Sequence, residues 1–300
     1  MAESAKKICK RLHAYLKMDG YRGTVQSVFA NAVNIVTPIG LVSVLSNAHC
    51  LHPYSMVIQS VKPFTQMGIQ EGQEVLLADE TLQIPACACS IDYRQATDLD
   101  LSIGVMQTLF IPIDLSIRTR HLYRVIEGCG SSDDLSPLVT EAKTNPYCDL
   151  IRPRLPALCD ALNEQDILLC EQAAARLAGC GVGLTPSSDD LLTGYMSAYA
   201  ALSMALGRSR DRVLPLTRAI ASGASAHTTD LSAAFLLQSG EGLVSEDVFA
   251  LLRSIFSDVS YPTMVAQATK VAAFGSTSGT DILTGMYLAI IHHYGGKNIE

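Results

Sequence analysis

Residues 23–61, GTVQSVFANAVNIVTPIGLVSVLSNAHCLHPYSMVIQSV, contain no Asp, Glu, Lys or Arg. Their Val, Ile, Leu and Thr residues gather in short runs separated by turn residues; the runs are 24–29, 32–37, 41–46 and 55–59. Such β-branched runs with turns between them predict antiparallel strands. A set of strands without charge must have both faces largely covered, as in a closed barrel or a tight sandwich. The stretch therefore predicts a barrel-like antiparallel sheet.

The sequence on either side extends the same domain. Further strands are predicted at 74–78, 81–85 and 101–106. Upstream, Ile8, Leu12 and Leu16 share one face of residues 4–19 while lysines cover the other, which predicts a short amphipathic helix. We expect residues 1–130 to form a β-rich, barrel-like domain with a short N-terminal helix.

From residue 131 onward the apolar residues recur with the period of a helix. The candidate helices are 150–162, 165–178, 188–206, 210–224, 228–238, 245–256, 262–271 and 281–293. Residues 131–300 are therefore expected to form a mostly α-helical domain. Two segregated halves, one β-rich and one helical, place the fold in the α+β class.

The composition excludes several classes of function. The chain has 300 residues, of which 48% are apolar, and this hydrophobicity excludes a disordered chain. Acidic residues outnumber basic ones by 29 to 22, there is no Trp, and the net charge is −7 at pH 7. A nucleic-acid partner is not expected, because it needs a basic face and usually aromatic stacking residues.

The sequence predicts a cytoplasmic protein with no membrane partner. The first residues reach no apolar segment of the kind a signal peptide requires. The longest uncharged window, 191–207, falls short of the ~20 apolar residues that span a bilayer, and we interpret it as a buried core helix. Nine cysteines, scattered and odd in number, suit reduced thiols better than a disulfide framework.

An internal echo marks a candidate site in the helical half. Residues 183–194 (GLTPSSDDLLTG) and 275–285 (GSTSGTDILTG) share Gly-x-Thr, small residues, then Asp, two aliphatics, Thr and Gly, with one gap. Glycine lets the backbone turn sharply, and a helix start offers N–H groups with partial positive charge. Such loops bind carboxylate, phosphate or similar anions. Neither copy has the Lys-Ser/Thr of a Walker A loop or the spacing of a dinucleotide site.

A purely structural interpretation stays open for each part of the echo. Asp189, Asp190 and Asp281 are favoured in a first helical turn whatever the function. Gly194 and Gly285 are also the residues that let two buried helices touch. Between the copies, residues 226–232 (AHTTDLS) place Thr229 and Ser232 near a helix start, where an ordinary N-cap is an equal alternative.

Three segments of the helical half together resemble the AllH family, named for a subunit associated with oxamate carbamoyltransferase. The family motifs GPGLTPSGDD, TTxIS and GHTSGxD appear here as 181–190 (GVGLTPSSDD), 228–232 (TTDLS) and 275–281 (GSTSGTD). The N-terminal half is similar only in its β pattern. Val182, Ser188 and Ser276 replace a proline, a glycine and a histidine, which is compatible with a divergent paralogue acting on another substrate.

The resemblance implies a part in carbamoyl transfer, oxalurate plus phosphate giving oxamate plus carbamoyl phosphate, within purine or allantoin nitrogen catabolism. It also implies a small anionic ligand of the phosphate, oxamate or oxalurate type and partner proteins, one similar to an acyl-CoA synthetase subunit. A tetrahedral oxyanion in this chemistry needs preorganised N–H donors.

The site residues that follow from the resemblance fall into three groups. Ligand binding is assigned to the two loops, at Gly181, Gly183, Thr185, Ser187, Ser188, Thr277, Ser278 and Gly279. Hydroxyl donors are assigned to Thr228, Thr229 and Ser232. Asp189, Asp190 and Asp281 are assigned to orient a donor, act as a base or hold Mg²⁺, the one possible cofactor.

The sequence is open to three further interpretations. The clusters 49–52 (HCLH) and 87–89 (CAC) offer soft metal ligands, but their spacing differs from that of zinc sites, and no metal site is predicted. His292 and His293 are expected to be a charged pair at a helix C-terminus. The alternative to an enzyme is a non-catalytic subunit, whose β domain docks partner proteins and whose helical domain binds a regulatory or structural anion.

Overall fold

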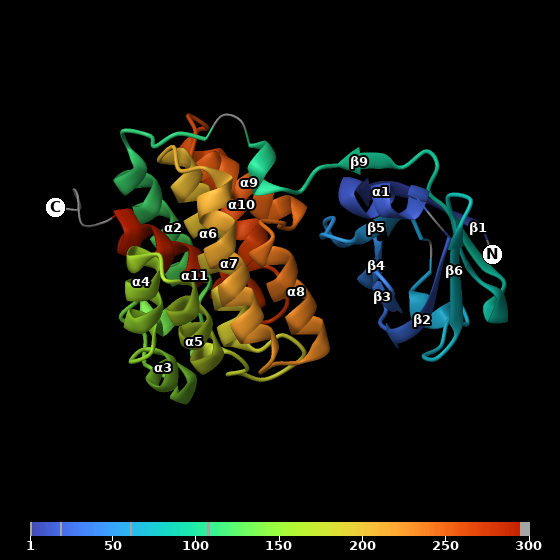
Figure 1. Ribbon diagram of the computed structural model, residues 1–300, viewed down its shortest axis with the longest axis horizontal. Helices are drawn as coiled ribbons and strands as arrows, with labels where there is room; N and C mark the ends of the chain where they lie inside the picture. Colours follow the sequence, from blue (N-terminus) through green and yellow to red (C-terminus); the bar gives the residue numbers. More distant parts are fainter. Residues whose placement is uncertain (1, 19, 61, 107–108, 295–300) are drawn as a thin grey trace. The chain divides into compact units, whose positions relative to one another are not determined.

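The computed structural model describes residues 2–18, 20–60, 62–106 and 109–294. The chain divides into two compact units, Met1–Leu101 and Ser102–Glu300 (Figure 1). The first is β-rich and the second helical, which confirms the α+β class. The expected boundary at residue 130 lies at the end of helix α2 (Leu115–Cys129), within the second unit.

The first unit is a closed barrel. Its strands are β1 (Ala2–Cys9), β2 (Tyr21–Val28), β3 (Ala32–Thr37), β4 (Gly40–Ser46), β5 (Ser55–Ile58), β6 (Glu74–Ala78), β7 (Thr81–Ile84), β8 (Cys89–Asp92) and β9 (Thr97–Leu99). The order β5-β4-β3-β2-β6-β7-β8-β1 closes because β1 also pairs with β5, and β9 adds to the end of β1. The barrel is mixed rather than purely antiparallel, since β1–β8, β1–β9 and β4–β5 are parallel pairs.

The uncharged stretch builds half of this barrel, as its composition predicts. It supplies most of β2 and all of β3, β4 and β5. Many of its apolar side chains are buried, among them Ile35, Val42, Val44, Met56 and Ile58, whereas Phe29 and Val36 are exposed. The strands predicted at 74–78 and 81–85 correspond to β6 and β7.

One local prediction in this unit and one at the start of the second unit are wrong. Residues 4–19 were expected to form one helix, but they divide into strand β1 and helix α1 (Lys10–Met18). The pairing of β1 with its neighbouring strands closes the barrel, and this tertiary pairing outweighs the local helical pattern of residues 4–9. Residues 101–106 form a short 3-10 helix, Ile103–Val105, rather than a strand. The sequence pattern also missed β8 and β9, whose runs are only four and three residues long.

The second unit is a bundle of helices. After α2 come α3 (Pro146–Ile151), α4 (Leu155–Glu164), α5 (Ile167–Leu177), α6 (Ser187–Ala205), α7 (Arg210–Ser225), α8 (Asp230–Gly240), α9 (Glu246–Ile255), α10 (Tyr261–Ala272) and α11 (Ser278–Tyr294). The helix predicted at 150–162 is split between α3 and α4 around Pro153 and Pro156. Helix α2 was not predicted.

Helices α6 and α11 form the centre of the bundle and pack against each other most extensively (Figure 1). A Cβ added at Gly194 would lie 2.0 Å from the carbonyl oxygen of Ile282, and one added at Gly285 would lie 2.0 Å from that of Leu191. Both glycines therefore serve close helix packing, which confirms the structural interpretation of these two positions. Within the described part of the chain, no helix has the length and apolarity needed to cross a membrane.

Candidate functional site

The two halves of the sequence echo meet in space. Helix α6 begins at Ser187 and α11 begins at Ser278, and the hydroxyl oxygens of Thr185 and Ser278 are 3.1 Å apart. Residues more than ninety positions apart in the chain thus share one contact at the starts of the two central helices. We call this region, with residues 181–190 and 277–281, the helix-start junction.

The junction has an approximate two-fold relation. In the echo Ser187 corresponds to Ser278, and Asp190 corresponds to Asp281. The hydroxyls of Ser278 and Thr185 face the carboxyl of Asp190, whereas the hydroxyl of Ser187 faces the carboxyl of Asp281. Each helix therefore supplies a serine to the aspartate of the other, just as each supplies a glycine to the other's backbone. The echo is a structural repeat as well as a sequence repeat.

Asp189 has a different environment from its neighbour Asp190. Its Oδ1 accepts hydrogen bonds from the Gly179 amide at 2.8 Å and from the Ser188 hydroxyl at 3.3 Å. Its Oδ2 accepts from the hydroxyls of Ser232, at 2.7 Å, and Thr228. With four donors and 1% exposure, this carboxylate ties the glycine loop to the start of α8.

The middle segment of the sequence pattern is also held by internal contacts. Thr228 and Ser232 donate to Asp189, as described. Thr229 is the N-cap of α8, where its hydroxyl accepts from the Ser232 amide at 3.2 Å and donates to the Leu184 carbonyl at 2.6 Å. The N-cap interpretation is confirmed for Thr229. The segment is hydrogen-bonded to the glycine loop through Leu184 and to the start of α6 through Asp189.

The glycine loop ahead of α6 leaves backbone donors exposed. Gly181 and Gly183 have φ of 140° and 92°, and a Cβ at Gly181 would lie 2.3 Å from the Ser187 amide nitrogen. Val182 and Leu184 at the tip are 76% and 54% exposed. Within the described residues, the amides of 182–184 donate to no protein acceptor. Consecutive free backbone amides in a turn are the groups by which protein loops bind anions.

The remaining loop residues are occupied within the fold. Ser188 exchanges two hydrogen bonds with the Cys180 backbone, from amide to carbonyl at 2.9 Å and from the Cys180 amide to its hydroxyl at 2.8 Å. The Gly279 amide donates to the Phe274 carbonyl, and the Thr277 carbonyl accepts from Asp281. Of the donors predicted to bind a ligand, the amides of Ser188 and Gly279 are therefore already hydrogen-bonded within the protein.

Asp190 and Asp281 are the electrostatically unusual groups of the junction. Burial raises the pKa of Asp190 to about 7, opposed by hydrogen bonding from Ser278 and Thr185. Burial raises the pKa of Asp281 to about 8, and the nearby charge of Asp190 adds to this rise. Oδ1 of Asp281 accepts from the Leu135 amide at 2.7 Å, but Oδ2 of each aspartate is buried without a hydrogen-bond partner among the described residues.

The carboxylates of the junction do not fit a Mg²⁺ site. Both carboxyl oxygens of Asp189 already accept hydrogen bonds from protein donors. Burial raises the pKa of Asp190 and Asp281, which disfavours the charged carboxylate that Mg²⁺ binds. Over the described ranges, no group of three or more His, Cys, Asp or Glu residues is arranged to hold a metal ion. The three aspartates are therefore assigned no role as metal ligands.

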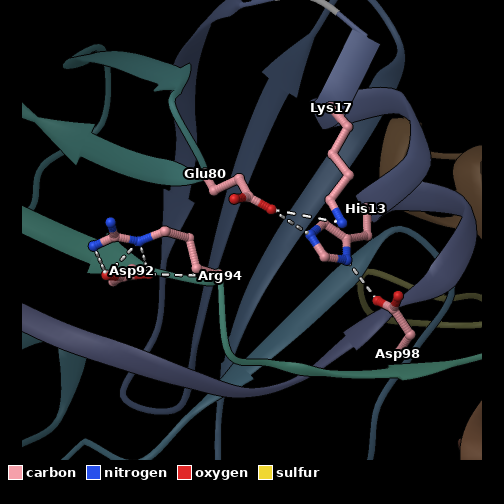
Figure 2. A network of polar contacts seen from close by, with 6 residues as sticks. All are labelled: His13, Lys17, Glu80, Asp92, Arg94 and Asp98. Atoms are coloured by element: carbon pink, nitrogen blue, oxygen red, sulfur yellow. Dashed lines mark hydrogen bonds and ion pairs between the residues drawn. The ribbon is translucent and has the colours of Figure 1, made fainter.

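A polar cluster in the barrel was not found from the sequence. Buried His13 on α1 places Nδ1 2.6 Å from Asp98 on β9 and Nε2 3.4 Å from Glu80 in the β6–β7 turn (Figure 2). Lys17 lies 3.6 Å from the same Glu80 oxygen. The cluster joins three elements of the barrel, and these partners lie too far apart in sequence for any local pattern to connect them.

The prediction for His292 and His293 is wrong. The Tyr195 hydroxyl lies 3.1 Å from Nδ1 of His292 and 2.9 Å from Nε2 of His293, whose Nδ1 lies 2.9 Å from Asn163. Burial lowers the pKa of both imidazoles, that of His293 to about 4. They are thus neutral hydrogen-bonding groups around a buried tyrosine and not a charged pair.

Fold and site together define a class: a mixed β-barrel followed by a helical unit whose two central helices start at one hydroxyl-rich, carboxyl-containing junction. Two family models match the chain. The model described as oxamate carbamoyltransferase subunit AllH matches residues 177–290, and the AllH family N-terminal domain matches residues 4–98. The chain belongs to the AllH family. No solved structure matches it.

Proposed function

We propose that the chain is the subunit of an oxamate carbamoyltransferase that holds the small anionic ligand of the reaction at the helix-start junction. The observation that carries the proposal is the 3.1 Å contact between Thr185 and Ser278, which joins the two echoed loops inside the segment matched by the AllH model. The free amides of 182–184 beside this contact supply N–H donors for a phosphate or carboxylate.

The reaction we propose is oxalurate plus phosphate giving oxamate plus carbamoyl phosphate. A phosphate oxygen forms a bond to the carbamoyl carbon, the bond from that carbon to the inner nitrogen breaks, and the nitrogen leaves with a proton as the amide of oxamate. Negative charge develops on the carbamoyl oxygen during the attack. Preorganised N–H donors stabilise such charge, and the glycine loop presents them without reorganisation.

Substitution of Gly183 tests the loop as a ligand site. Its φ of 92° strains any other residue, but nothing lies within 4 Å of an added Cβ, so Gly183→Val changes the loop without disturbing the core. We expect phosphate and oxamate affinity, measured by calorimetry on the full chain, to fall at least about tenfold. Wild-type affinity in this variant would contradict the proposal.

A matched control is available in the barrel. Gly72 also has a positive φ, 83°, and open space around its Cβ position. Gly72→Val therefore introduces a similar backbone strain outside the junction, and we expect it to leave ligand affinity unchanged while lowering the melting temperature by a comparable amount.

A second candidate function is a non-catalytic subunit that binds the anion for a partner enzyme. It is favoured by the internal use of Asp189, Thr228 and Ser232, which leaves few side chains free for chemistry. The discriminating experiment follows oxamate formation from oxalurate and phosphate with the chain alone and with its partner proteins, including the acyl-CoA synthetase-like subunit. Turnover by the chain alone favours the catalytic role; binding without turnover until partners are added favours the second.

A further inference from the structure

We propose that Asp190 and Asp281 bind the primary amide group of the carbamoyl-transfer ligand, while the glycine loop binds its anionic end. This assignment rests on the proposed function and deepens it, because it gives the two carboxyls a role in recognising the amide group of the ligand. Three arguments support it. Oδ2 of each aspartate has no hydrogen-bond partner among the described residues, the two carboxyls lie at corresponding positions of the repeat, and their chemistry disfavours an anion or a metal ion as the bound group.

The first observation is a pair of unsatisfied acceptors. Asp190 is 7% exposed and Asp281 is 0% exposed, yet Oδ2 of each lacks a hydrogen-bond partner within the described part of the chain. A buried polar atom without a hydrogen-bond partner destabilises the folded state, and folded proteins rarely leave one without reason. Two such atoms at one junction indicate that a donor occupies the site when it is filled.

The second observation is that both carboxyls are fixed in orientation. The Leu135 amide holds Oδ1 of Asp281 at 2.7 Å, and the Ser187 hydroxyl faces the same carboxyl. The hydroxyls of Ser278 and Thr185 face Asp190 from the other helix. The two free oxygens are therefore presented from two helices related by the repeat.

The chemistry of these oxygens selects the ligand group. An anion would be repelled by either carboxyl in its charged form, and a metal ion lacks a third protein ligand among the described residues. A primary amide carries two N–H donors on one nitrogen, which matches two acceptors contributed by two helices.

The ligand class is therefore a small molecule with an amide at one end and a carboxylate or phosphate at the other. The anionic end binds the amides of 182–184. These amides lie in the loop directly before α6, and Asp190 lies in the first turn of that helix. Oxamate has this layout, and pyruvate has the same shape with a methyl group in place of the –NH₂.

The test compares oxamate with pyruvate on the full wild-type chain by calorimetry. Because pyruvate cannot donate to Oδ2 of either aspartate, we expect oxamate to bind at least about tenfold more tightly. Asp190→Ala is expected to reduce this preference to about onefold by weakening oxamate and sparing pyruvate. Asp281→Ala gives a second, independent variant if the first fails to fold. Asp230→Ala, at the exposed start of α8, is the matched control and should keep the wild-type preference.

The relative affinities for oxamate and pyruvate test the amide assignment separately from the proposed function. Equal affinity of the wild-type chain for oxamate and pyruvate, or a preference that survives Asp190→Ala and Asp281→Ala, would overturn the amide assignment and leave the proposed function standing. Binding of neither compound, with the partner proteins present, would overturn the proposed function and the assignment with it. A preference lost in both aspartate variants and kept in Asp230→Ala supports the assignment.

Discussion

At the scale of single residues, the junction shows how environment separates adjacent identical side chains. Asp189 accepts hydrogen bonds from four donors, whereas Asp190 is faced by two hydroxyls and burial raises its pKa. The sequence DD at 189–190 gives no means of telling them apart, because the donors that distinguish them include residues far away in the chain: Thr228 and Ser232 for Asp189, and Ser278 for Asp190. The first is an anchor of the fold, and the second is a candidate for contact with a ligand.

The anchoring role of Asp189 predicts a large loss of stability in Asp189→Ala. The substitution leaves the Gly179 amide and the Ser232 and Thr228 hydroxyls without their acceptor in a buried position. We expect the free energy of unfolding in urea to fall by about 2–4 kcal/mol. Asp230→Ala, at an exposed first-turn position, should cost less than about 1 kcal/mol. A loss as small as that of the control would show that Asp189 is not an anchor.

The raised pKa values of Asp190 and Asp281 predict a dependence of stability on pH. In the folded state they keep their protons to about pH 7 and about pH 8, whereas unfolded aspartate loses its proton near 3.8. The folded state binds more protons over this window, so the free energy of unfolding should fall as the pH rises from about 4 to about 8. Each group contributes up to about 1.4 kcal/mol per pH unit.

Asp281→Asn checks this sign directly, because asparagine has the shape of the neutral carboxyl and does not titrate. Urea titrations at several pH values should show a flatter profile for the variant, which gains stability relative to wild type at pH 8. Identical profiles for the two proteins would mean that folding does not raise the pKa of Asp281.

At the scale of elements, prediction from the sequence succeeded where pattern and tertiary context agree. The uncharged runs became β2 to β5, and the apolar windows of the second half became α5 to α11. It failed at β1, where lysines suggest a helix but barrel closure requires a strand, and at β8 and β9, which are too short to show a period. The junction itself was anticipated, since the two echoed loops do meet, but the division of roles among its aspartates was not.

The close crossing of α6 and α11 predicts that Gly194 tolerates no side chain. A Cβ there would lie 2.0 Å from the backbone oxygen of Ile282, which cannot move without the whole helix. We expect Gly194→Ala to lower the free energy of unfolding by about 2–3 kcal/mol. Gly128→Ala, in helix α2 with nothing within 4 Å of the added atom, should be neutral or stabilise by up to about 1 kcal/mol. Equal effects in the two variants would contradict the packing geometry.

At the scale of the whole molecule, each unit carries its own core, and each is matched by its own family model. The composition anticipated this division into a β-rich and a helical half. It could not show that the barrel closes through parallel as well as antiparallel pairs, because closure depends on β1 meeting β5 and β8 at once.

The distribution of thiols over the molecule predicts their reactivity. All nine cysteines lie within the described residues and none forms a disulfide; Cys129 is exposed, while Cys9, Cys89, Cys148 and Cys170 are buried. Burial raises the pKa of several of the others, which lowers their thiolate fraction. Titration of the native chain with a disulfide reagent should show one fast thiol, which Cys129→Ser removes, and nine after denaturation. Fewer than nine after denaturation without reductant would reveal a disulfide.

The central claim is that the junction of α6 and α11 is the ligand site, and a crystal structure of the chain soaked with oxamate tests it most directly. The account predicts oxamate between the glycine loop and α11, with its carboxylate on the amides of 182–184 and its amide against Asp190. Oxamate bound in the barrel, or a junction that stays closed to oxamate at saturating concentration, would contradict it.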